Sequence, residues 1–278
     1  MVRAVWSHRV KPGTARADSR DASYNARVLD PTKRFSKRVE NYIKYRPGYP
    51  AEIIPLLVSE CGLTPEWVIA DLGSGTGFLT KLFLEQGNKV FGVEPNDEMR
   101  AAGEKLLAEY PKFISVKASA EATTLADRST DLIAAGQAFH WFDRAVARVE
   151  FQRILRPQGW VVLIWNGFRV EMSPLNRGYQ QIVLRYGTDY KEVAREITGV
   201  DVSSFFAPRS CQAATFRFKQ VFDFAGLKGR LLSSSYAPET TDPNFDRMIE
   251  ELRELFEANQ REGKVDFNYE TEVYYGQL

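Results

Sequence analysis

The chain has 278 residues and is nearly neutral, with 37 Lys and Arg against 36 Asp and Glu. Apolar residues make up 44% and charged residues 26%, which is typical of globular proteins, and no apolar run is long enough for a membrane helix. Two cysteines and two histidines provide neither a disulfide framework nor a zinc pattern. We expect a cytoplasmic protein that has no membrane partner or metal site and forms a monomer or a weak homodimer.

The N-terminal region carries most of the positive charge. Residues 1–50 contain twelve Lys and Arg against four Asp and Glu, a net charge of +8 that leaves −7 for the rest of the chain. Residues 1–31 lack the apolar centre of a secretion signal, and we interpret them as a basic, flexible arm. Such an arm attracts nucleic acid or an anionic substrate, or it is a solvated tail.

Residues 32–62 contain two helical patterns. The stretch DPTKRFSKRVENYIKY, residues 30–45, has helical character up to a Pro-rich break, RPGYP. A second helix is expected within AEIIPLLVSECG, residues 51–62, with Pro55 near its first turn. We expect these helices to form a lid on a single domain that spans residues 32–278.

Three glycines within five positions mark a binding loop in ADLGSGTGFLTKLFLEQG, residues 70–87. Because glycine has no Cβ, a turn with Gly73, Gly75 and Gly77 can adopt positive φ and let a ligand lie against its amide groups. The following stretch has apolar residues at helical spacing and points its positive dipole end at the loop. The pattern predicts that a polar ligand binds there.

Strands and helices alternate through the expected core, residues 63–166. The strand-like stretches are WVIADL, KVFGVEP, FISVKAS, DLIAAGQ and WVVLIWN, with helical stretches between them. This order predicts an α/β, Rossmann-like, doubly wound and mostly parallel sheet with helices on both faces. We interpret residues 167–213 as an inserted helical cap. Residues 214–278 resume with a strand, helices and a last strand, VDFNYETEVYYGQL.

The residues around the loop discriminate between nucleotide-like ligands. A dinucleotide fingerprint reads G-x-G-x-x-G, but here Phe78 stands where that fingerprint has its third glycine. Asp71 precedes the loop and would repel a pyrophosphate, whereas it would attract an amino group. S-adenosylmethionine carries an adenosine and an ammonium but no phosphate. Glu94 closes the next strand, where a carboxylate can accept hydrogen bonds from ribose hydroxyls.

The stretch from Val68 to Asn166 resembles the class I S-adenosylmethionine-dependent methyltransferases of the type 11 domain. The motifs VIADLGSGTGFLTKLFLEQG, VFGVEPNDEM, SAEATTL, TDLIAAGQAFHWF and RILRPQGWVVLIW follow the family's order. The resemblance implies a seven-stranded sheet with a reversed final strand. It also implies that Asp71 and Gly73 hold the methionine end of the cofactor, with S-adenosylhomocysteine as product.

The family's adenine-reading motif is acid, alanine, acid, but this chain has Ser119, Ala120 and Glu121. Adenine is then read by the Ala120 backbone, by Glu121 or through water. The cofactor-binding residues expected in total are Arg46, Asp71, Gly73, Ser74, Gly75, Gly77, Glu94, Pro95, Ala120, Glu121 and Gln137.

Two short motifs, RPGYP and AFHWFD, resemble a narrower branch that includes the trans-aconitate methyltransferases. This resemblance implies a small acceptor, and a carboxylic acid in particular. Arg46 could bind the cofactor's carboxylate or such an acidic substrate.

Methyl transfer from a sulfonium mainly needs positioning and exclusion of water, so a general base is optional. His140 follows a predicted strand and is the candidate catalytic residue, or else a structural histidine. Tyr45, His140 and Trp141 are the expected substrate contacts. The alternatives are an RNA methyltransferase that uses the basic arm, and a non-catalytic module that only binds S-adenosylmethionine; nucleic acid is the less favoured partner because no RNA-binding module follows the sheet.

Overall fold

The structure is a computed structural model that describes residues 39–191, 194 and 200–278. The proposed basic arm, residues 1–31, lies outside the described residues. So do residues 32–38 of the expected lid and residues 192–193 and 195–199 of the expected cap. In the described part of the chain, no helix is both long and apolar enough to cross a membrane.

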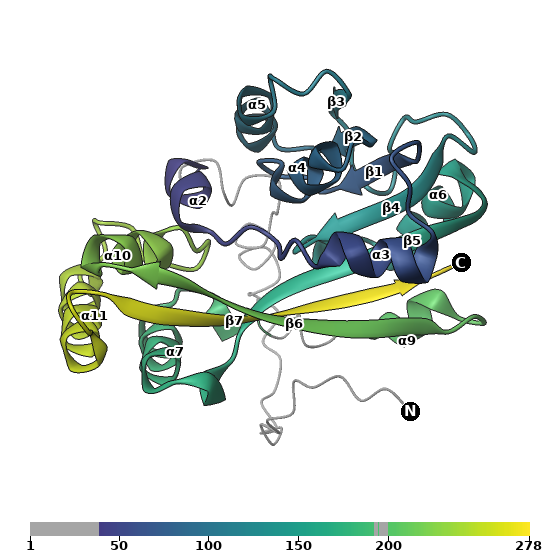
Figure 1. The fold of residues 1–278 in the computed structure, drawn as a ribbon. Helices are drawn as coiled ribbons and strands as arrows, with labels where there is room; N and C mark the ends of the chain where they lie inside the picture. The colour runs from purple at the N-terminus through teal and green to yellow at the C-terminus, as the bar shows by residue number, and fades with distance from the viewer. Residues whose placement is uncertain (1–38, 192–193, 195–199) are drawn as a thin grey trace, which may run out of the picture.

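Seven strands form one sheet in the order β3-β2-β1-β4-β5-β7-β6 (Figure 1). Strands β1 to β5 are parallel, whereas β7 runs antiparallel to both β5 and β6. The strands are β1 Val68–Leu72, β2 Lys89–Val93, β3 Phe113–Val116, β4 Thr130–Gly136, β5 Leu155–Phe168, β6 Cys211–Phe222 and β7 Val265–Gly276. This sheet confirms the predicted mostly parallel, seven-stranded architecture with a reversed final strand.

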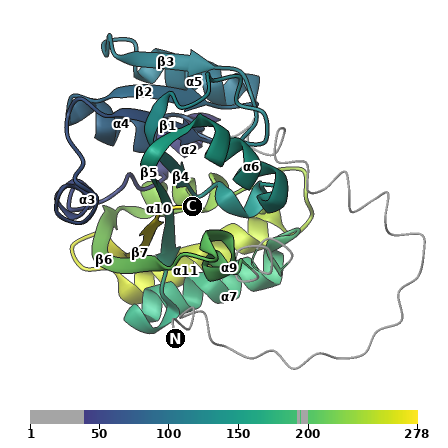
Figure 2. The ribbon, with the colours of Figure 1, turned by 90° about the vertical axis from the view of Figure 1, so that its right-hand side faces the viewer.

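Helices cover both faces of the sheet, as predicted (Figure 2). The α-helices are α2 Val39–Tyr45, α3 Ile53–Cys61, α4 Phe78–Glu85, α5 Asp97–Leu106, α6 Arg144–Ile154, α7 Pro174–Tyr186, α9 Val202–Phe206, α10 Phe224–Leu232 and α11 Phe245–Asn259. Two short 3₁₀ turns, η2 Phe139–Trp141 and η3 Val170–Met172, lie close after β4 and β5.

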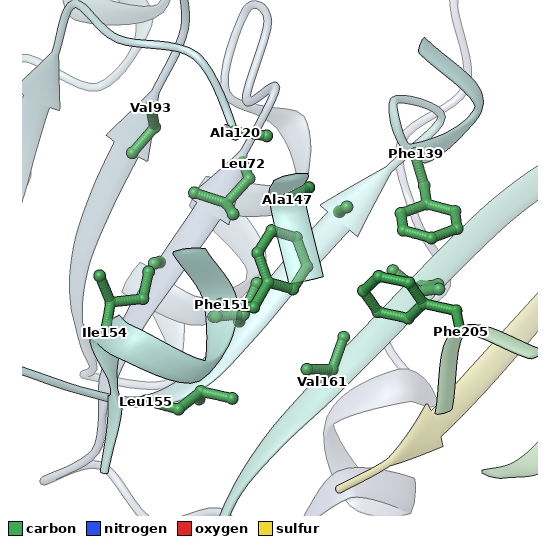
Figure 3. Packing of buried hydrophobic residues seen from close by; sticks show 14 of the residues in the cluster. Leu72, Val93, Ala120, Phe139, Ala147, Phe151, Ile154, Leu155, Val161 and Phe205 are labelled. Atoms are coloured by element: carbon green, nitrogen blue, oxygen red, sulfur yellow. The ribbon is translucent and has the colours of Figure 1, made fainter. Parts of the chain in front are cut away.

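The alternation of side chains along each strand divides the core into two layers. In β1, Ile69 packs with α3 and α4 on one face, while Ala70 packs with α6 and α9 on the other. In the second layer Phe151 of α6 makes an edge-on contact with Phe205 of α9, with ring centroids 5.7 Å apart (Figure 3). These two layers hold β1, β2 and β4 rigidly, so that the loops after them are positioned by a packed core.

A third apolar cluster lies beyond the parallel strands. Helices α7, α10 and α11 pack there against Phe267 and Tyr269 of β7 (Figure 1). This cluster joins α7, from the segment expected as a cap, to α10 and α11, which come from the segment after it. The neighbouring N-terminal helix α2 contacts α10. Two helices that are far apart in the sequence, α2 and α10, therefore pack against each other.

Candidate active site

A cavity of about 320 Å³ opens at the carboxyl ends of β1, β2, β4 and β5. In open α/β sheets this is the edge where ligands bind, beside the point where the strand order reverses. Twelve of the residues predicted to form the site line the cavity: Arg46, Asp71, Gly73, Ser74, Gly75, Glu94, Pro95, Ala120, Glu121, Gln137, His140 and Trp141. The structure thus brings together residues that are spread over about a hundred positions in the sequence.

The glycine loop lies directly against the sheet. The amides of Gly73 and Ser74 both donate to the Val93 carbonyl at the end of β2, at 2.8 and 3.1 Å. Gly73 has φ +68°, and a Cβ there would lie 2.5 Å from the Ala138 Cβ. Only glycine fits this position, because its backbone is left-handed and Ala138, in the turn after β4, approaches it closely.

Gly77 has a structural role instead of lining the cavity. It caps the start of α4 with φ +86°, and a Cβ there would lie 2.6 Å from Leu107 Cδ1. The third glycine of the loop therefore allows α4 to begin close to the end of α5. It shapes the loop, while Gly73 and Gly75 lie along the cavity wall.

Asp71 is a buried carboxylate at the end of β1, with 1% of its surface exposed. The Thr80 hydroxyl donates to Asp71 Oδ2 at 2.6 Å. Oδ1 is buried and has no hydrogen-bond partner among the residues that the structure describes. Burial raises the pKa of Asp71 to about 7, the Thr80 hydrogen bond opposes this shift, and nearby Glu94 adds to it. A buried acceptor without a partner, lining the cavity, fits a ligand ammonium.

Glu94 ties the two cofactor-side loops together. Its Oε2 accepts from the Gly75 amide at 2.9 Å, and its Oε1 accepts from the Asn96 amide at 2.8 Å. Burial raises the pKa of Glu94, while these two hydrogen bonds lower it. Each carboxylate oxygen retains a further lone pair, so Glu94 can accept from ribose hydroxyls while it holds the glycine loop.

We predict that Glu94→Gln weakens binding of S-adenosylhomocysteine by about 1.5–3 kcal/mol, the range for a hydrogen bond to a charged group. Calorimetry measures the affinity, and thermal unfolding of the ligand-free protein separates loss of the Gly75 and Asn96 contacts from loss of ribose contacts. Unchanged affinity in a folded Glu94→Gln protein would refute the ribose assignment.

The expected adenine-side residues also line the cavity. Ser119 and Ala122 form an isolated β-bridge that places buried Ala120 on the wall. Glu121 Oε1 accepts from the Asp143 amide at 2.9 Å, next to the start of α6. One oxygen of Glu121 is therefore engaged with the protein, and its contact with adenine remains a prediction.

Gln137 has φ +57° directly after β4. Its backbone N–H donates to the Ile164 carbonyl at 2.9 Å, and its side-chain Nε2 donates to the backbone carbonyl of Asn166 at 2.7 Å. Asn166 in turn donates through its side chain to the Gly48 carbonyl at 2.9 Å. Gln137 therefore lines the cavity and also fixes Asn166, which holds the Pro-rich segment; its contact with the cofactor stays a prediction.

The predicted substrate contacts fall into two groups. His140 and Trp141 lie in η2 on the cavity wall, with ring centroids 4.6 Å apart, and His140 is buried. Tyr45 packs instead against Gly229 of α10, where a Cβ would overlap its ring, and does not line the cavity. Its neighbours Tyr42 and Tyr49 do line the cavity, and the Tyr49 hydroxyl lies against Gly136 at the end of β4.

Two arginines line the cavity, Arg46 and Arg230. Arg46 donates to the Ser233 hydroxyl at 3.1 Å and to the Ser233 carbonyl at 3.3 Å, and its guanidinium lies 5.4 Å from the centre of the Tyr42 ring. Burial lowers the pKa of Arg46, and the nearby Arg230 lowers it further. Sequence reasoning missed Arg230, because nothing in the stretch GLKGRLL distinguishes it from a surface residue of a short helix.

The order and direction of the strands, with a cavity at the carboxyl ends of the parallel strands, define the Rossmann-like architecture of class I methyltransferases. Residues 70–163 match the methyltransferase domain family. Uncharacterized methyltransferases of Mycobacterium tuberculosis and Schizosaccharomyces pombe are 38% and 35% identical to this chain over 132 and 133 residues. These alignments cover 48% of this chain in both cases, and 51% and 52% of the two proteins. The chain spans about half the length of the curated relatives it matches.

Among solved structures, a putative type II methyltransferase from Anaeromyxobacter dehalogenans superposes with a TM-score of 0.62 at 20% identity. The match covers 84% of this chain and 98% of that one, so it shows the shared fold. The family match agrees with the predicted methyltransferase domain over residues 70–163, and the superposition confirms the predicted Rossmann-like fold. They do not select the branch that includes the trans-aconitate methyltransferases, which stays a prediction.

Proposed function

We propose that this chain transfers a methyl group from S-adenosylmethionine to a small acidic molecule bound in the cavity. The observation that carries this proposal is that a carboxylate and a guanidinium line the same cavity: Asp71 lies at the glycine loop, and Arg46 lies in the Pro-rich segment. The amino-acid end of S-adenosylmethionine matches that pair, since its ammonium would contact Asp71 and its carboxylate would contact Arg46. Glu94 at the end of β2 completes the set with an acceptor for ribose.

The residues of the chain would bind and orient the reactants and exclude water. S-adenosylmethionine, when bound, supplies a methyl group on a sulfonium, which is an activated leaving group. The aromatic side chains of Trp141, Phe142 and Trp165 line the cavity and exclude water from it. A carboxylic acid is ionised at neutral pH and is already a nucleophile, so the chain would need to supply no base.

The proposal is tested by incubating the protein with methyl-labelled S-adenosylmethionine and panels of carboxylic acids, amines and phenols. We expect label in the acid panel. Methylation confined to amines or phenols would contradict the acidic acceptor. Binding of the cofactor without transfer to any panel would favour the non-catalytic module, and a steep fall of polynucleotide affinity with salt would favour RNA.

We predict that Arg46→Lys lowers kcat/KM on the best acid acceptor more than His140→Asn does. Lysine is a point charge and cannot donate to Ser233 and a carboxylate with the geometry of the guanidinium fork. His140→Asn should cost far less than the ~100-fold that loss of a general base would cost. Steady-state kinetics of both variants measure this. Activity lost in His140→Asn and retained in Arg46→Lys would reverse the two roles.

A further inference from the structure

Arg230 is a buried cation whose hydrogen-bond partners are neutral hydroxyl groups. Only 4% of its surface is exposed, although it belongs to the cavity wall. Its Nε donates to the Tyr269 hydroxyl at 2.8 Å and its Nη1 to the Ser234 hydroxyl at 3.3 Å, and its guanidinium stacks on Phe267. Across the described ranges of the chain, no carboxylate pairs with it.

A second guanidinium lies close by, which increases the cost of leaving Arg230 without an anion. Burial lowers the pKa of Arg46 and the charge of Arg230 lowers it further, and the Ser233 hydroxyl accepts from Arg46 Nε at 3.1 Å and donates to the backbone carbonyl of Arg230 at 2.7 Å. Burying one unpaired charge is expensive, and burying two like charges that repel each other is more so. The cofactor carries a single carboxylate, so it can neutralise only one of them.

The position of each arginine indicates which one serves the cofactor. Arg46 begins the Pro-rich segment RPGYP, in which the Gly48 carbonyl accepts from the Asn166 side chain and Tyr49 lies against Gly136 beside the glycine loop. Arg230 lies on α10, within the third apolar cluster and away from the parallel strands. Arg46 therefore faces the methionine end of the cofactor, and Arg230 faces the remaining part of the cavity.

We propose that Arg230 forms an anion subsite for the methyl acceptor, separate from the site of the cofactor's carboxylate at Arg46. This proposal rests on the proposed function. Tyr236 lies beside it on the wall, and its hydroxyl has no hydrogen-bond partner in the described part of the chain, so it is a second donor for the anion. The Tyr190 and Tyr236 rings meet edge-on, with centroids 4.9 Å apart, and line the same region. The subsite therefore fits a carboxylate attached to a flat, apolar body.

The test measures binding of benzoate by calorimetry to the protein saturated with S-adenosylhomocysteine. Benzamide is the uncharged control of the same shape, and phenyl phosphate distinguishes a phosphate head group from a carboxylate. We expect benzoate to bind wild-type protein at least about tenfold more tightly than benzamide does. Arg230→Gln should remove this difference while it leaves the affinity for S-adenosylhomocysteine within about twofold.

Arg46→Gln is the matched control, because it removes the other guanidinium of the pair. This variant should lower the affinity for S-adenosylhomocysteine and leave the affinity for benzoate unchanged. Should Arg230→Gln fail to fold, as judged by circular dichroism, Arg230→Lys carries the test with an expected loss of about three- to tenfold in benzoate affinity. Benzoate affinity that survives in a folded Arg230 variant, or equal binding of benzoate and benzamide to wild type, would overturn the subsite. Failure of wild type to bind S-adenosylhomocysteine would instead overturn the proposed function.

Discussion

Asp71→Asn is expected to weaken binding of S-adenosylhomocysteine by about 100-fold or more, because removing one partner of a buried ion pair costs 3–5 kcal/mol. In the ligand-free protein, Oδ1 of Asp71 is a buried acceptor without a partner among the described residues, and only Thr80 donates to the other oxygen. The asparagine has the same shape but no charge to attract the ligand ammonium. Calorimetry of both proteins measures the difference.

The same carboxylate should make cofactor binding depend on pH. Because the pKa of Asp71 is raised to about 7, the ligand-free carboxyl takes up a proton as the pH falls below that value. The ammonium binds the ionised form, so affinity should fall about tenfold per pH unit well below 7 in wild type, and much less in Asp71→Asn.

Stability of the ligand-free protein should change in the opposite sense. The folded pKa of Asp71 lies above its unfolded value, so the folded chain binds this proton more tightly than the unfolded chain does. Asp71 therefore destabilises the fold above pH 7, and this cost is relieved as the pH falls from about 7 towards 4. Asp71→Asn should remove that dependence and leave the protein at least as stable as wild type at pH 8.

Asp131→Asn is the matched control for these measurements. Asp131 lies in β4 and accepts from the Val68 amide at 2.8 Å, at the opposite end of β1 from Asp71, and it also pairs with Arg156. Loss of the Asp131 charge should lower the stability of the protein and leave its affinity for S-adenosylhomocysteine unchanged. Equal affinity for S-adenosylhomocysteine in wild type and folded Asp71→Asn would show that the ammonium is bound elsewhere.

Gly75→Val should abolish cofactor binding and leave the protein folded. Gly75 has φ +57°, a conformation that a β-branched residue adopts only with strain. A Cβ there would meet only the flexible end of Met99, at 3.3 Å, so the fold can accommodate it. The valine side chain would enter the cavity, and the strained backbone would pull the Gly75 amide away from Glu94. Calorimetry and circular dichroism read out binding and folding.

Gly62→Val separates backbone strain from obstruction of the cavity. Gly62 ends α3 with φ +78°, nothing lies within 4 Å of a Cβ there, and it is not part of the cavity wall. Gly62→Val should lose about as much stability as Gly75→Val does, but it should bind S-adenosylhomocysteine with the affinity of wild type. Intact binding in Gly75→Val would mean that the glycine loop is only a tight turn.

The cofactor side of the cavity could be predicted from sequence because its signals are local. Asp71, Gly73 and Gly75 belong to one strand–loop–helix unit, and Glu94 ends the next parallel strand, so strand order alone brings them to one edge. Gly77 belongs to the same glycine pattern, yet it packs against Leu107 and does not line the cavity. The pattern cannot distinguish a glycine that faces a ligand from one that faces a helix.

The acceptor side could not be predicted because it depends on contacts between distant segments. Arg230 lies at the cavity because α10 packs on α2. The same contact between α2 and α10 keeps Tyr45 out of the cavity, because the Tyr45 ring covers Gly229. Nothing in the spacing of aromatic residues around RPGYP tells whether Tyr45 or Tyr49 faces the strands.

Isothermal titration of the purified protein with S-adenosylhomocysteine and, separately, with NAD tests the central claim most directly. Asp71 beside the glycine loop should accept the ammonium of the first ligand and repel the pyrophosphate of the second. We predict saturable binding of one S-adenosylhomocysteine per chain and no measurable heat with NAD. Binding of NAD without binding of S-adenosylhomocysteine would contradict the assignment of this cavity to S-adenosylmethionine.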